Sequence, residues 1–176
     1  MDPGLQDLQG KAERVKPTEI LRLLLDAYAE KAALRGRHVA AAATAGQYDV
    51  NNTYQYVIAR EDQHLSWLAD AILGLGGAVP PELAPQGLAA EKGEEAARRL
   101  AKSDADALDA FVAAWKPRAN DVSNARHKLM LNLMLGEMLE QARLFHQAAG
   151  GDLDLLGRRT GGARMPGAVL PARWVE

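Results

Sequence analysis

Hydrophobic residues recur along most of this chain at the three- and four-residue spacing of amphipathic α-helices, and no segment alternates in the manner of a β-strand. The pattern predicts helices over residues 18–45, 51–75, 89–102, 103–115 and 120–149. The helix over residues 89–102 is short and highly charged, and the other four are the main helices. We therefore expect an all-α protein built as a four-helix bundle.

Residues typical of helix termini flank these segments. The predicted helix ends lie at Pro17, Gly46, Asn51 or Asn52, Gly76, Ser103, Pro117 and Gly150. The connection after the second helix contains Pro80, Pro81 and Pro85, so it is too rigid to be helical. We expect this connection to be a long crossover from one end of the bundle to the other.

The composition is typical of one soluble helical domain. The chain has 176 residues, of which 48% are hydrophobic and 25% charged, and it has no cysteine. We divide it into a lead-in over residues 1–17, a bundle over residues 18–150, and an irregular C-terminal tail over residues 151–176 that packs on the bundle or on a partner subunit. The net charge of -2 gives no electrostatic reason to expect nucleic acid or a membrane as a partner. We expect a cytoplasmic protein, because neither a signal peptide nor a membrane-spanning run is evident.

The tetrad Glu61-Asp62-Gln63-His64 lies within the apolar stripe of the second predicted helix. That stripe comprises Val57, Ile58, Leu65, Leu68, Ala71, Ile72 and Leu75. Glu61 and His64 are three residues apart, so both fall on or beside the buried face and can reach one common point. Because a buried carboxylate without a partner is costly, we expect a cation, an arginine or a proton beside Glu61.

This arrangement resembles the ferritin-like superfamily, in particular its rubrerythrin-type branch. In that family, each half of the bundle supplies a Glu from one helix and a Glu-x-x-His from the next. These residues bind two iron or manganese ions that support oxidation by dioxygen or peroxide. The segment from Leu24 to Glu30, followed by Glu61 and His64, is similar to the first half. The resemblance covers residues 18–150 and implies that Glu30, Glu61 and His64 bind metal.

The second half matches the family pattern less closely. Glu137 and Glu140 stand where the family has Glu-x-x-His, and the resemblance adds both as metal ligands. The third helix offers only the shorter carboxylates Asp104, Asp106 and Asp109. Of these, Asp106 has the spacing to Glu137 that Glu30 has to Glu61. The more cautious interpretation is a single metal held by Glu30, Glu61, His64 and Glu137.

Other interpretations of these carboxylates stay open. Glu61 could form a buried ion pair with Arg35 or Arg60. Glu140 could be exposed and form a pair with Arg143, three residues further along the helix.

The histidines and methionines also allow more than one interpretation. A different class of metal-dependent bundle uses three histidines, which here would be His38, His64 and His146. Each histidine other than His64 is more typical of a surface or capping position. Met130, Met134 and Met138 recur every four residues and are either core packing or a dimer face.

Two functional hypotheses result. In the first, the chain is a metal-binding ferritin-like protein, an oxidoreductase that uses iron or manganese to act on dioxygen or peroxide. In the second, it is a metal-free helical bundle that serves as an interaction or oligomerisation module. Under both hypotheses we expect a homodimer or a higher homo-oligomer.

Overall fold

The computed structural model describes residues 17–81, 93–152 and 154–156. Within these residues the chain forms four helices and no strand: α1 (Pro17–Thr44), α2 (Tyr48–Gly74), α3 (Glu94–Asn120) and α4 (Ala125–Ala149). The prediction of an all-α architecture is confirmed. The expectations for the lead-in, most of the proline-bearing connector and most of the C-terminal tail fall outside the described residues.

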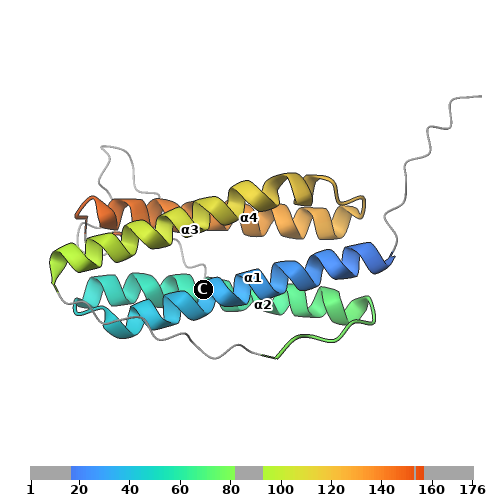
Figure 1. Ribbon diagram of the computed structural model, residues 1–176, viewed down its shortest axis with the longest axis horizontal. Helices are drawn as coiled ribbons and strands as arrows, with labels where there is room; N and C mark the ends of the chain where they lie inside the picture. Colours follow the sequence, from blue (N-terminus) through green and yellow to red (C-terminus); the bar gives the residue numbers. More distant parts are fainter. Residues whose placement is uncertain (1–16, 82–92, 153, 157–176) are drawn as a thin grey trace, which may run out of the picture.

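The helices form two antiparallel pairs. α1 packs mainly against α2, and α3 packs mainly against α4. Weaker contacts between α2 and α4, and between α1 and α3, join the two pairs. Figure 1 shows that α2 and α3 run in the same direction, so α2 ends at the opposite end of the molecule from the start of α3.

The apolar core draws on all four helices. Leu24, Leu68, Leu108 and Met138 come from different helices, and each is fully buried. Burying a side chain of this size contributes about 1.5–3 kcal/mol. Met134 also belongs to this core, so the structure favours core packing for this part of the methionine series.

The third helix differs from the prediction. α3 is continuous from Glu94 to Asn120, so the division into separate helices over residues 89–102 and 103–115 is wrong. Ser103 is not an N-cap but lies inside α3, where its hydroxyl accepts a hydrogen bond from Arg37 at 2.7 Å. Pro117 neither breaks α3 nor opens α4, because a proline in the last turn removes only one backbone hydrogen bond before the helix ends.

The starts of α2 and α4 also differ from the prediction. α2 begins at Tyr48, and its N-cap position is Gln47 instead of Asn51 or Asn52. The side-chain amide of Asn51 donates to the carbonyl of Ala42 at 2.9 Å, which ties the start of α2 to the end of α1 across a short turn. α4 begins at Ala125 and not at residue 120, after Asn124, whose side chain caps the helix.

Candidate functional site in the bundle core

Lys31 is fully buried in the middle of α1. The buried positions of α1 include Ile20, Leu24, Ala27, His38 and Ala41, and Lys31 continues the same three- and four-residue spacing. The neighbouring residue Glu30 is turned by about 100° around the helix axis, and its side chain is 51% exposed. Glu30, one of the metal ligands that the resemblance implies, therefore does not face the core, and Lys31 occupies the buried position instead.

The buried carboxylate of Glu61 has a partner on each oxygen. Lys31 Nζ lies 2.7 Å from Glu61 Oε1, and His38 Nδ1 lies 2.9 Å from Glu61 Oε2. All three side chains are fully buried. Because a carboxylate can only accept, His38 Nδ1 must donate. The expected cation beside Glu61 is confirmed, but it is Lys31 and not Arg35 or Arg60; the placement of His38 at the surface is wrong.

Charge and burial act against each other in this pair. Burial opposes ionisation of Glu61, but the charge of Lys31 and the hydrogen bond from His38 outweigh it and hold the pKa of Glu61 below its usual value. Burial lowers the pKa of Lys31, and the Glu61 carboxylate partly offsets that effect. The 2.7 Å separation is typical of a charge-assisted contact between an ammonium and a carboxylate.

A second polar group lies beside the first. His64 is fully buried, and its Nε2 lies 2.9 Å from Glu137 Oε2. Arg60 holds the same carboxylate, with Nε 2.9 Å from Oε2 and Nη2 2.5 Å from Oε1. Burial and the nearby charge of Lys31 lower the pKa of His64 to about 4, against the opposing effect of Glu137. His64 is thus a neutral imidazole at pH 7, and its Nε2–H donates to Glu137.

Several polar atoms in this region are buried without a partner. They are His38 Nε2, His64 Nδ1, and both the Nε2 and the Oε1 of Gln141. The two imidazoles therefore share one arrangement: one ring nitrogen contacts a carboxylate and the other is buried without a hydrogen-bond partner. Such atoms in native proteins generally contact a bound water or a ligand.

A third polar group connects α1, α2 and α3. The hydroxyl of Tyr54 donates to Asp104 Oδ2 at 2.5 Å, and Arg37 Nε donates to Asp104 Oδ1. Asp104 is fully buried, whereas Asp106, the aspartate selected by spacing, is exposed and pairs with Lys102. Burial, followed by the Asp104 charge, raises the pKa of Tyr54, so the hydroxyl stays protonated and donates.

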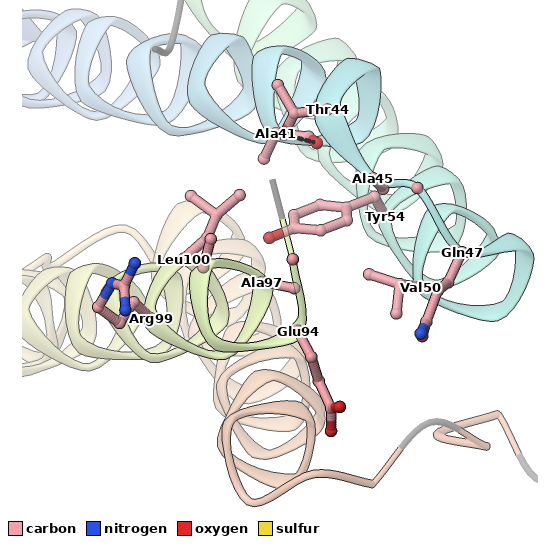
Figure 2. A pocket seen from close by; sticks show the side chains of 13 residues that line it. Ala41, Thr44, Ala45, Gln47, Val50, Tyr54, Glu94, Ala97, Arg99 and Leu100 are labelled. Atoms are coloured by element: carbon pink, nitrogen blue, oxygen red, sulfur yellow. Dashed lines mark hydrogen bonds between the residues drawn. The ribbon is translucent and has the colours of Figure 1, made fainter. Parts of the chain in front are cut away.

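A cavity of about 690 Å³ lies at the end of the bundle beside Tyr54. Figure 2 shows that its walls come from the end of α1, the start of α2 and the start of α3, and that the Tyr54 ring projects between them. Ala41, Val50 and Leu100 make much of the wall apolar. None of the five predicted metal ligands lines this cavity.

Glu30 and Glu140 lie apart from the buried pairs. Glu30 Oε2 accepts a hydrogen bond from Trp115 Nε1 at 2.7 Å, and the guanidinium of Arg118 stacks 3.7 Å above the Trp115 ring. Glu140 is exposed and forms an ion pair with Arg143 at 2.9 Å. The alternative interpretation of Glu140 as an exposed partner of Arg143 is confirmed.

The structure thus brings together Glu61, His64 and Glu137 in or beside the core but not Glu30 or Glu140. In the described ranges, no three histidine or acidic side chains are arranged to hold a metal ion. His146, the third member of the histidine alternative, is half-exposed and pairs with Asp109 at 2.7 Å. The five predicted ligands do not converge on one point in this arrangement, because Glu30 and Glu140 are exposed and pair with other side chains.

Lys31 is the site residue that the sequence analysis missed. The sequence does indicate that Lys31 is buried: it lies seven residues from both Leu24 and His38, and this spacing places all three on one face of α1. Gln141 has the same spacing on α4, because it lies seven residues from both Met134 and Ala148.

No protein-family model, curated protein or solved structure matches this chain. Over residues 17–81, 93–152 and 154–156, no helix has the length and apolarity needed to cross a membrane.

Proposed function

We propose that this protein is a ferritin-like helical bundle that functions without a metal in its core, as an interaction or oligomerisation module. One observation carries the proposal: the Lys31 ammonium lies 2.7 Å from the Glu61 carboxylate, with both side chains fully buried. This ammonium supplies the positive charge that metal ions supply in the family that the sequence resembles. A side-chain cation leaves the bundle with its core charge balanced in the absence of metal.

The helix arrangement supports the ferritin-like part of the proposal. α2 and α3 run in the same direction, which is the arrangement that the predicted crossover requires (Figure 1). Glu61 and His64 both enter the core from α2, which agrees with the Glu-x-x-His pattern behind the resemblance.

α4 offers a face for self-association. Leu129 and Leu133 lie one turn apart on this helix and are 72% and 51% exposed. Gly136 extends the same face, and apart from its chain neighbours and the adjoining helix backbone no atom lies within 4 Å of the place where its Cβ would be. An exposed apolar stripe with a small residue allows the same face of a second copy to approach closely.

Light scattering of the purified protein tests the oligomerisation proposal. We expect a dimer or a higher oligomer, and we expect the double variant Leu129→Glu, Leu133→Glu to be monomeric with an unchanged circular dichroism spectrum. Leu73→Glu is the matched control, because Leu73 is also an exposed leucine but lies on α2. A monomeric wild-type protein at micromolar concentration would exclude this self-association.

Metal-dependent oxidation by iron or manganese is a second candidate function. It is favoured by the arrangement of His38 and His64, because in metal sites a carboxylate commonly holds one imidazole nitrogen while the other binds the metal. The ligand set Glu30, Glu61, His64, Glu137 and Glu140 stays a prediction. Elemental analysis of the purified protein, before and after reconstitution with ferrous iron or manganese, decides between the two candidates.

A further inference from the structure

The cavity beside Tyr54 has the size of a small-molecule site. Its volume of about 690 Å³ lies within the usual range of such sites, roughly 300–1,000 Å³. Of the residues that the structure describes, 13 line the cavity, whereas each side of a stable protein interface takes about 20–30 residues. These dimensions favour a small molecule over a partner protein as the occupant.

The apolar residues of the wall keep surface that a ligand can reach. Val50 on α2 and Leu100 on α3 are half-buried, and Ala97 on α3 is exposed. All three are in the wall that Figure 2 shows around the Tyr54 side chain. Tyr54 itself is only 3% exposed, so the contacts of a ligand fall mainly on these aliphatic side chains. The accessible wall is thus suited to an apolar molecule.

The charged groups at the cavity already have partners. Glu94 pairs with Arg98 at 2.5 Å and Arg99 pairs with Glu95 at 3.4 Å, in both cases along α3. Glu94 and Glu95 also lie in the first turn of α3, where their charges offset the positive end of the helix dipole. An ionic ligand would compete with one of these pairs. The described wall therefore favours a neutral ligand.

We propose that this cavity binds a neutral hydrophobic small molecule, with the side chains of Val50, Ala97 and Leu100 as its main contacts. Binding removes apolar surface of both the ligand and the wall from water, which is favourable. Both ion pairs of α3 stay intact in the complex. The proposal depends neither on self-association nor on metal in the core.

N-Phenyl-1-naphthylamine is a suitable probe, because it is neutral and its fluorescence rises when it moves from water to an apolar site. We expect fluorescence titration of the full chain to show saturable binding of one molecule per chain. 1-Anilinonaphthalene-8-sulfonate is the same molecule with an added sulfonate, and we expect it to bind about tenfold more weakly or worse, since its charge finds no free partner.

Ala97→Trp tests the position of the site. Ala97 is exposed, so the variant should remain folded, and we expect the indole to fill the cavity and weaken probe binding about tenfold or more. Ala97→Glu should weaken binding as well, because it places a charge in the wall. Ala110→Trp is the matched control: Ala110 is an exposed alanine of α3 that does not line the cavity, and we expect its replacement to leave binding unchanged.

The double variant Leu129→Glu, Leu133→Glu separates the cavity from the exposed face of α4. We expect it to bind the probe as the wild type does, because neither leucine lines the cavity. The proposal is overturned if the wild type shows no saturable binding, if the sulfonate binds equally well, if Ala97→Trp and Ala110→Trp bind alike, or if the double variant loses binding. Circular dichroism confirms that each variant is folded.

Discussion

Replacing Lys31 with methionine is expected to lower the free energy of unfolding by about 3–5 kcal/mol, because the substitution leaves a buried carboxylate without its cation. Methionine keeps most of the volume of the lysine chain, so the loss reports the charge and not a cavity. Both Lys31 and Glu61 are fully buried, which excludes water from the broken pair. Urea denaturation followed by circular dichroism measures the difference.

Two further variants serve as controls for the stability loss expected of Lys31→Met. Lys102→Met removes an exposed lysine that pairs with Asp106 on the surface of α3, and its expected cost is about 0.5 kcal/mol or less. Adding Glu61→Leu to Lys31→Met should recover stability, because the unpaired charge is then removed. If Lys31→Met costs no more than Lys102→Met, Lys31 does not balance the charge of Glu61.

Asp104→Ala is expected to lower the free energy of unfolding by about 3 kcal/mol, because one fully buried carboxylate serves two helices. The substitution leaves the Tyr54 hydroxyl buried without its acceptor and removes the partner of Arg37. Asp104→Asn keeps an acceptor for Tyr54 and should cost less. The stability of each variant is measured by the same denaturation experiment.

Tyr54→Phe separates the two contacts of Asp104. By itself it removes a buried hydroxyl that donates at 2.5 Å, and in the Asp104→Ala background it should cost much less, because the hydroxyl has already lost its acceptor. Asp109→Ala, which breaks a half-exposed pair with His146, provides the surface control. Additive losses from Tyr54→Phe and Asp104→Ala would contradict the network described here.

The burial of Glu61 and His64 could be predicted from the sequence. Their neighbours on α2 form an apolar stripe with regular spacing, and two polar residues on such a stripe are forced into the core by the residues around them. The need for a cation beside Glu61 followed from the cost of a buried charge. The cation is Lys31 on α1, so the sequence of α2 alone could not identify it.

The missed residues lie on the other helices. Glu30 and Lys31 are adjacent, and one position changes the direction of a side chain by about 100°. Glu30 was selected because its chemistry fits the family pattern, but the spacing of the buried positions of α1 places Lys31 in the core. Asp106 was selected by its spacing to Glu137, whereas the buried positions Ala101, Ala105 and Leu108 place Asp104 on the buried stripe of α3. The contacts of Glu137 with Arg60 and His64 depend on how α2 and α4 pack, and spacing within one helix carries no such information.

The number of metal atoms per chain tests the central claim most directly. Elemental analysis should be made on protein purified without an affinity tag or chelator, before and after anaerobic reconstitution with ferrous iron or manganese. If the Lys31 ammonium supplies the core charge, wild-type protein and Glu61→Gln will both retain no stoichiometric metal. One or more iron or manganese atoms per wild-type chain, lost in Glu61→Gln while the fold survives, would contradict this account and establish the metal-binding function instead.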